Sequence, residues 1–196
     1  RTTVSKTGVL DCSKLFQYKY NDDIFKKISV TPDGKNHGLI FNLDWSGSMS
    51  HILFSTMKQL LNLIQFCNKT GIPFEVYAFT NEWDSESVQK VKEVKENEIT
   101  IEKFNMIKFA SSDLKKRDLD KVMKYMFRTA FCMTYRAADY NIPYKLYLSG
   151  TPLNEAIISM KQILPIFQKR NKVEKCHIIN LTDGEGSCVM RNKKPC

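Results

Sequence analysis

Long apolar runs, glycine- or proline-rich tracts and internal repeats are all missing from this sequence of 196 residues. No apolar segment approaches the roughly 18 residues that a membrane-spanning helix needs. The first nine residues lack the apolar core of a secretory signal peptide. With 42% hydrophobic residues, 8 Gly and 6 Pro, the composition is that of a globular domain long enough to bury a core of its own.

Two kinds of motif are also missing. There is no G-x-x-x-x-G-K-[ST] loop to cradle phosphates, so we expect the chain to hydrolyse no ATP alone. The six cysteines contain no C-x-x-C pair, which argues against a structural zinc site and against a disulfide framework. A chain of this length needs no disulfides, so we expect reduced thiols and a cytoplasmic location.

Acidic residues are in the minority, and the formal net charge is +9. The basic residues are scattered apart from short runs at 115–117 and 191–194, and no basic motif interleaved with aromatics accompanies them. A soluble basic surface explains this pattern. The alternative is that the basic surface binds an acidic partner, among which nucleic acid is a minority interpretation.

The sequence does contain an alternation of strand-like and helix-like segments. Short apolar runs predict buried strands at 38–44, 73–80, 104–110 and 177–183. Apolar residues at helical spacing predict helices at 51–69, after the N-cap residues 111–113, and from Pro152 onward. The alternation predicts an α/β fold, Rossmann-like and doubly wound, with a mostly parallel sheet and helices on both faces.

Finer expectations concern the helices. In the first helix the apolar stripe consists of Leu53, Met57, Leu60, Leu61 and Ile64. In the second helix it consists of Leu119, Val122, Met123, Met126, Phe127 and Ala130, which we interpret as core packing. In the third helix we expect Pro165 to kink or end the helix.

The domain boundaries follow from composition. Residues 1–37 are a polar lead-in, with a short helix around 13–18, that we expect to pack on the domain formed by residues 38–196. Within that domain, the charged segment 81–103 is expected to be a loop or a protruding hairpin.

The predicted sheet is expected to be incomplete at its C-terminal end. We count four strands, whereas a doubly wound sheet usually carries six. Only 13 residues follow Asp183, and most of them are polar. The edge beside strand 177–183 would then be bare. We therefore expect either further residues in the natural protein or an edge covered by another chain or by residues 1–37.

The strongest functional signal is that two of the predicted strands end in aspartate, at Asp44 and Asp183. In an open α/β sheet, ligands bind beyond the carboxyl ends of the strands, where the strand order reverses. If these strands are neighbours, the two carboxylates meet, and Ser46 and Ser48 project from the loop between strand and helix. Hydroxyl and carboxylate oxygens suit a hard cation such as Mg²⁺.

Three segments here resemble the loops of the metal-ion-dependent adhesion site in von Willebrand factor A domains. "DWSGSMS" at 44–50 matches the D-x-S-x-S signature, "SGTPLNEAI" at 149–157 resembles the second loop, and "NLTDGEG" at 180–186 resembles the third. They occur in the expected chain order.

The resemblance implies a metal set of Asp44, Ser46, Ser48, Thr151 and Asp183. It implies that the serines bind Mg²⁺ directly, that the threonine does so in the ligand-bound state, and that the aspartates act partly through water. Mn²⁺ or Ca²⁺ are the alternative ions. A carboxylate of a protein partner takes the last coordination position. Trp45 stands where a small residue is common in the family, and we expect it to reshape the rim of the site.

The lead-in adds a narrower resemblance. "KTGVLDCSKL", "NDDIFKK" and "YAFTNEW" look like parts of the C-terminal A domain of cobaltochelatase T-subunit-type proteins, including viral and bacterial relatives. This resemblance implies a non-catalytic subunit that works beside an AAA+ ATPase of the MoxR or chelatase kind. It also implies the host cytoplasm as the location if the protein is viral.

Other interpretations of the same residues remain. Ser46, Ser48 and Thr151 could be helix caps, and Asp183 with the following glycine could be a plain turn. An extracellular adhesion module of the same fold is the main alternative function. A metal-dependent hydrolase is a further one, although no general base is evident, because surface or packing roles suit both His51 and His177.

Overall fold

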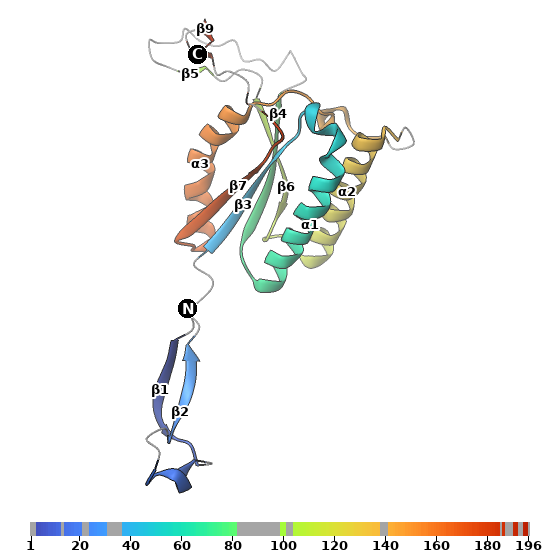
Figure 1. Ribbon diagram of the computed structural model, residues 1–196. Helices are drawn as coiled ribbons and strands as arrows, with labels where there is room; N and C mark the ends of the chain where they lie inside the picture. The colour runs from blue at the N-terminus through green and yellow to red at the C-terminus, as the bar shows by residue number, and fades with distance from the viewer. Residues whose placement is uncertain are drawn as a thin grey trace. The chain divides into compact units, whose positions relative to one another are not determined.

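The computed structural model describes residues 3–12, 14–20, 24–30, 37–81, 99–100, 104–137, 141–184, 186, 190–191 and 194–195. The chain divides into two compact units, Arg1–Gly34 and Lys35–Cys196 (Figure 1). This division lies three residues before the boundary expected from composition. The packing of the lead-in on the larger unit stays a prediction.

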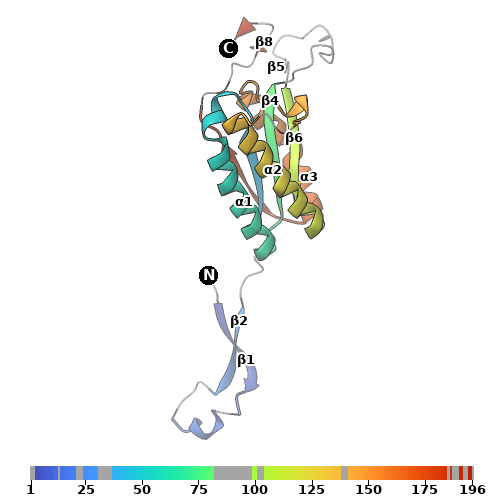
Figure 2. The same cartoon turned by 90° about the vertical axis from the view of Figure 1, so that its right-hand side faces the viewer.

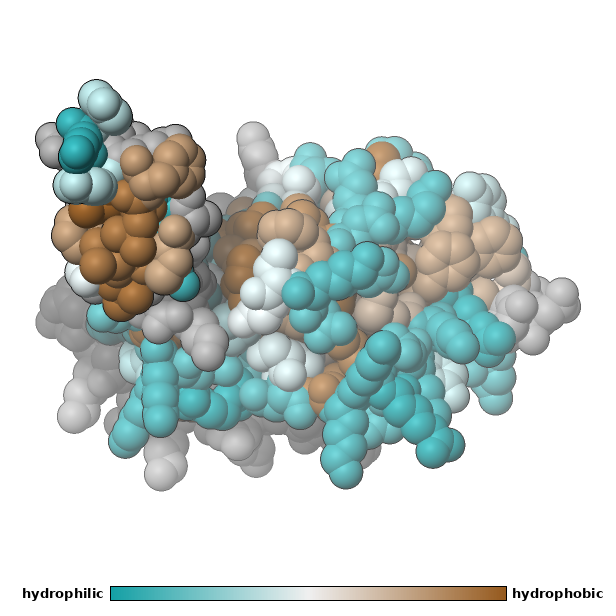
Figure 3. Space-filling model, turned by 90° about the horizontal axis from the view of Figure 1, so that it is seen from below, coloured by the Kyte–Doolittle hydropathy of each residue, from teal (hydrophilic) through white to brown (hydrophobic). Residues whose placement is uncertain are grey.

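The smaller unit is a β-hairpin. Its strands β1 (Thr3–Leu10) and β2 (Phe25–Val30) pair antiparallel, and a 3-10 turn, η1 (Leu15–Gln17), lies between them. The short helix expected around 13–18 is therefore only this single turn. Apolar side chains are exposed on this unit, which is brown at the left of Figure 3. The exposed apolar residues are Val9, Leu10, Leu15, Phe16, Tyr18 and Tyr20.

The larger unit is built on a four-stranded sheet with the order β6-β4-β3-β7. Its strands are β3 (His37–Asp44), β4 (Phe74–Asn81), β6 (Phe104–Ser111) and β7 (Lys175–Leu181). β3 is parallel to both β4 and β7, whereas β6 is antiparallel to β4. The prediction of an α/β fold is confirmed, with a mixed sheet.

Three helices cover the two faces of this sheet. α1 (Leu53–Thr70) and α2 (Lys116–Tyr135) lie on one face, and α3 (Leu153–Asn171) lies on the other (Figure 1). Side chains alternate along β3, so that Phe41 and Leu43 pack under α1 and α2, whereas Ile40 packs under α3. The stripe expected on α1 is buried in full.

Two expected details of the helices are corrected by the structure. α3 does not end at Pro165 but continues to Asn171, and Phe167 beyond the proline is buried beside Gly38. A Cβ at Gly38 would lie 2.5 Å from the Phe167 ring, so only glycine admits this contact. α2 has Lys115 at its N-cap without a side-chain cap, so residues 111–113 do not cap it.

Segments outside the main sheet are short. β5 (Ile99–Thr100) pairs with β8 (Met190–Arg191), which pairs with β9 (Lys194–Pro195). Most of the segment 81–103, expected to be a loop or hairpin, lies outside the described residues. Among the described strands, β7 pairs only with β3, as expected for an edge strand, and Ile178 on it is 37% exposed. Continuation of the chain beyond this edge stays a prediction.

A buried carboxylate joins the sheet to α3. Glu75 on β4 is 2% exposed and accepts hydrogen bonds from Lys108 on β6 and Arg170 on α3. It also accepts one from the hydroxyl of Tyr77 at 2.7 Å. Burial by itself would raise the pKa of Glu75, but these donors and the Lys108 charge outweigh it and hold the pKa below the ordinary 4.5.

We expect Glu75→Gln to lower the free energy of unfolding by about 2–4 kcal/mol at pH 7, because Lys108 and Arg170 lose their shared buried anion and, among the described residues, only Arg170 keeps another partner, Asp113. A carboxyl with a lowered folded-state pKa stabilises the fold above its unfolded-state pKa, and this contribution disappears as the pH falls through the folded-state value. The difference in the free energy of unfolding between wild type and variant should therefore shrink below about pH 4.

Urea unfolding at pH 7 and pH 3 measures this difference. Asp120→Asn, at an exposed carboxylate, is the control. An equal difference at both pH values would contradict this assignment.

Candidate metal centre

Parallel pairing of β3 and β7 brings together the two strand ends that carry the predicted site. Leu43 is in register with Leu181, so Asp44 at the end of β3 lies beside the loop that follows β7. β4 lies on the other side of β3. β3 therefore lies between β4 and β7, and its carboxyl end lies beside that of β7. In open α/β sheets, ligands bind at strand ends of this kind.

Asp44 is fully buried at these strand ends. Its Oδ2 accepts a hydrogen bond of 2.7 Å from the hydroxyl of Thr182, whereas its Oδ1 is buried without a hydrogen-bond partner in the described part of the chain. Burial raises the pKa of Asp44, the charge of Asp183 raises it further, and the nearby Thr182 and Ser46 oppose the rise. A buried acceptor without a partner costs free energy unless a cation or a donor reaches it.

Three more of the predicted residues form a polar chain that leads from the interior to the surface. The hydroxyl oxygens of Ser46 and Ser48 are 2.9 Å apart, and the Ser48 hydroxyl donates to Asp183 Oδ1 at 3.1 Å. Ser46 is buried, whereas Ser48 and Asp183 are exposed. Ser48 and Asp183 meet although 135 residues separate them in the chain.

The segment that carries Thr151 is joined to the loop after β3 through the backbone of Ser149. The amide of Gly47 donates to the carbonyl of Ser149 at 2.8 Å, and the amide of Ser149 donates to the carbonyl of Trp45 at 3.2 Å. Thr151 follows this bridge by two residues and is half-buried. Within the described residues it forms no hydrogen bond with the other four side chains of the predicted set, so it is a neighbour and not a member of the polar chain.

Trp45 corrects an expectation from the sequence. It is fully buried, its indole nitrogen donates to the carbonyl of Leu146 at 2.8 Å, and its ring meets the edge of Phe109 at 5.1 Å. It therefore does not reshape the rim. The side chain points into the core because Phe41, Leu43 and Trp45 occupy every second position and so lie on the same face of the sheet. Its hydrogen bond to Leu146 holds the segment that leads to Thr151.

The capping interpretations of the same hydroxyls do not hold in this structure. The N-cap residue of α1 is Ile52 and that of α3 is Pro152, and neither end has a side-chain capping hydrogen bond. The hydroxyl of Thr182 does accept a weak hydrogen bond of 3.4 Å from the amide of Gly184, so a turn is present after β7. That turn holds Asp183 beside Ser48.

Neither histidine singled out in the sequence joins the polar chain. His51 is exposed at the end of η3 (Ser48–His51). His177 pairs in register with Leu39 and stacks on His37, with ring centroids 5.8 Å apart. Leu39 precedes Asp44 by five residues of extended strand, or roughly 16 Å.

Two participants were missed in the sequence, namely Thr182 and the pair Asn42–Asn180. Asn42 is fully buried, and its amide nitrogen donates to Asn180 Oδ1 at 2.9 Å across β3 and β7. Asn42 precedes Asp44 by two residues, so both point to the α3 face of the sheet. A polar residue at that spacing inside an apolar run was the available signal.

The donor set fits a hard cation. Among the described residues there is no group of three or more His, Cys, Asp and Glu side chains that could hold a metal ion. The cluster here consists instead of two carboxylates and hydroxyls, with one buried carboxylate oxygen free to accept. Oxygen ligands of this kind suit Mg²⁺, Mn²⁺ or Ca²⁺ better than zinc.

No family model, curated protein or solved structure matches the chain. In the part of the chain that the structure describes, no helix is long and apolar enough to cross a membrane. The four described cysteines, Cys12, Cys67, Cys132 and Cys176, are free thiols, and the other two lie outside the described residues.

Proposed function

We propose that this chain is a von Willebrand factor A-type domain that binds an acidic residue of a protein partner through a Mg²⁺-dependent adhesion site. The observation that carries the proposal is the meeting of Asp44, Ser46, Ser48 and Asp183 at the ends of two adjacent parallel strands. The buried, unpartnered Oδ1 of Asp44 adds an acceptor that a cation would satisfy.

The strand order supports the finer fold assignment. A central strand with its successor on one side and a later parallel strand on the other is the arrangement of a doubly wound sheet around its switch point. We infer that the larger unit has this winding, with β6 as an antiparallel edge.

In the proposed site, the hydroxyl oxygens of Ser46 and Ser48 would hold the cation, and Asp44 would offer it a buried carboxylate oxygen. Asp183 orients Ser48 through their hydrogen bond of 3.1 Å. Thr151 would have to approach when the partner binds, because it forms no hydrogen bond with the polar chain in this structure. The bound Mg²⁺ would supply a positive charge with an open coordination position for a partner carboxylate.

The partner class rests on the resemblance of the lead-in to cobaltochelatase-type A domains. We propose that the chain serves as a non-catalytic subunit beside an AAA+ ATPase in the cytoplasm. Within the described residues, neither His51 nor His177 forms a hydrogen bond with the polar chain, so nothing there adds support to the hydrolase alternative.

Metal binding by the purified chain tests the site. Ser46→Ala and Ser48→Ala should each weaken Mn²⁺ or Mg²⁺ binding at least tenfold in calorimetry, because each removes an oxygen ligand. Ser55→Ala, at an exposed serine on α1, is the matched control and should bind as wild type. Unchanged metal affinity in both site variants would show that the site assignment is wrong.

The partner step has its own readout. With a captured AAA+ partner, EDTA should dissociate the complex, and Asp183→Ala should prevent its formation. A complex that survives both treatments would place the contact on another surface.

A further inference from the structure

The outer surface of α1 and α2 carries a groove that the metal site does not use. It lies between the two helices, has a volume of about 380 Å³, and shares no lining residue with the polar chain at the strand ends. The groove is lined by Leu61, Gln65, Asp120, Met123, Lys124, Phe127 and Arg128. Figure 2 shows α1 and α2 side by side, facing the viewer, along this surface.

The floor of the groove is apolar. Leu61 is 8% exposed, Met123 is half-buried, and Phe127 is 41% exposed although its spacing predicted a core position. α2 turns this ring outward because Met126 and Ala130 fill the space against the sheet. The exposed Phe127 ring beside Leu61 and Met123 gives the groove an apolar contact surface.

Aromatic rings extend the groove toward the N-terminus of α1. Phe54 meets Phe127 edge-on at 5.0 Å and also contacts Phe131 and Tyr135 at 5.5 and 5.7 Å. Phe131 and Tyr135 are exposed. On α1 the surface runs from Phe54 to Gln65, or roughly 17 Å along the helix axis, which is long enough for about three turns of another helix.

The same two helices concentrate positive charge. Their basic residues are Lys58, Lys69, Lys116, Arg117, Lys121, Lys124 and Arg128, and their acidic residues are Asp118 and Asp120. Their net charge is therefore +5, more than half of the +9 of the whole chain. Among the described residues, none of these nine side chains forms an ion pair.

We propose that this groove binds an amphipathic helix of a partner protein that presents apolar side chains at i, i+3 or i+4 and i+7, flanked by Asp and Glu. The apolar floor would receive the apolar face. The acidic flanks would meet Lys124 and Arg128, which line the groove, and Lys58, which lies over the Phe54 ring. Because like charges repel, a second copy of this chain is a poor occupant of a surface with net charge +5. A nucleic acid could pair with the basic side chains but would leave the apolar floor uncovered.

Fluorescence anisotropy with a designed helical peptide tests the proposal. The probe is a 16-residue peptide with Leu and Phe at i, i+4, i+7 and i+11 and Glu on both flanks. One control peptide has the same residues in shuffled order, and a second has Lys in place of Glu. The acidic amphipathic probe should bind saturably and at least tenfold more tightly than either control, and added salt should weaken its binding.

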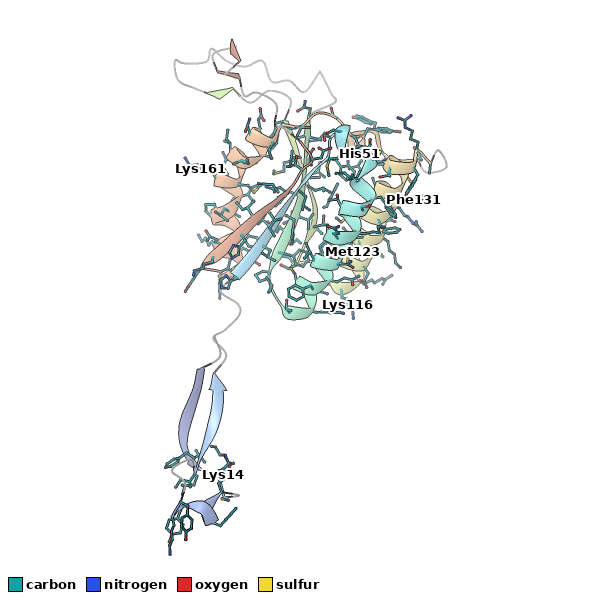
Figure 4. All side chains as sticks on the ribbon, in the orientation of Figure 1. Lys14, His51, Lys116, Met123, Phe131 and Lys161 are labelled. Atoms are coloured by element: carbon teal, nitrogen blue, oxygen red, sulfur yellow. The ribbon has the colours of Figure 1, made fainter. Side chains whose placement is uncertain are left out.

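Protein variants locate the binding. Lys124→Glu combined with Arg128→Glu should weaken the probe at least tenfold, and these exposed positions leave the core untouched. Lys161→Glu, on α3 at the other face of the sheet, is the matched control and should bind as wild type (Figure 4). Phe127→Ala should weaken the probe while Ser46→Ala should not, which separates this groove from the metal site.

Three outcomes would overturn the proposal. The first is equal binding of the acidic and shuffled peptides, or no saturable binding of either. The second is unchanged affinity in the Lys124 and Arg128 double variant. The third is displacement of the probe by a single-stranded oligonucleotide that binds more tightly and is weakened by the same variant, which would assign the surface to nucleic acid.

Discussion

Asp44→Asn is expected to raise the melting temperature of the metal-free protein and to abolish its stabilisation by Mn²⁺. The Asp44 carboxylate is fully buried, and its Oδ1 has no hydrogen-bond partner in the described part of the chain. Ionised Asp44 therefore destabilises the metal-free fold, by about 1–2 kcal/mol for an unpartnered buried acceptor. Asparagine keeps the acceptor for Thr182 and removes the charge.

The pH dependence of the free energy of unfolding gives the direction of the Asp44→Asn effect independently. The pKa of Asp44 is raised above the ordinary 3.8, chiefly by burial, so the folded state binds this proton more tightly than the unfolded state. The free energy of unfolding contributed by Asp44 falls as the pH rises from the unfolded-state value through the folded-state value. The advantage of Asp44→Asn without metal should therefore be absent in acid and fully developed at neutral pH.

Differential scanning calorimetry with EDTA and with Mn²⁺ measures both parts of the prediction. Each kcal/mol should shift the melting temperature by roughly 2–4 °C for a chain of this size. Asp118→Asn, at an exposed carboxylate of α2, is the control and should respond to Mn²⁺ as wild type does. A variant that melts lower than wild type in EDTA, or that Mn²⁺ still stabilises, would contradict the role given to Asp44.

The strands around this site could be predicted because a strand buried on both faces appears in the sequence as a short, continuous apolar run. β3 is an apolar run that ends at Asp44, and the structure places its boundary within one residue of the predicted start. The adjacency of β3 and β7 was a condition of the predicted site, and their parallel register meets that condition. Local pattern and long-range pairing agree here, so four of the five predicted site residues meet.

Other features could not be read from local pattern, because tertiary packing decides them. The end of α3 depends on Phe167 packing at Gly38, which overrides the tendency of Pro165 to stop a helix. β7 ends at Leu181, two residues earlier than predicted, so Asp183 lies in a loop, where it can reach Ser48. The spacing on α2 predicted a core position for Phe127, whereas Met126 and Ala130 fill the core and leave Phe127 exposed.

Trp45→Ala is expected to lower the free energy of unfolding by about 3–5 kcal/mol, the range for removing a fully buried large aromatic side chain. The variant loses the contact with Phe109 and leaves the carbonyl of Leu146 without its hydrogen bond. Trp45→Phe keeps a ring but not the donor, so it should cost less than the alanine variant.

The same substitution should reach the metal site through the backbone. The indole nitrogen of Trp45 donates a hydrogen bond to Leu146. Three residues later, Ser149 forms backbone hydrogen bonds with Trp45 and Gly47. Loosening this segment would displace Thr151 and the Ser46–Ser48 turn together, so Trp45→Ala should also weaken Mn²⁺ binding.

Urea unfolding and calorimetry on the same samples measure the two effects. Phe66→Ala, at a 54% exposed ring on α1, should cost under about 1 kcal/mol and leave Mn²⁺ affinity unchanged. If Trp45→Ala cost no more than this control, Trp45 would not be the anchor of the second loop.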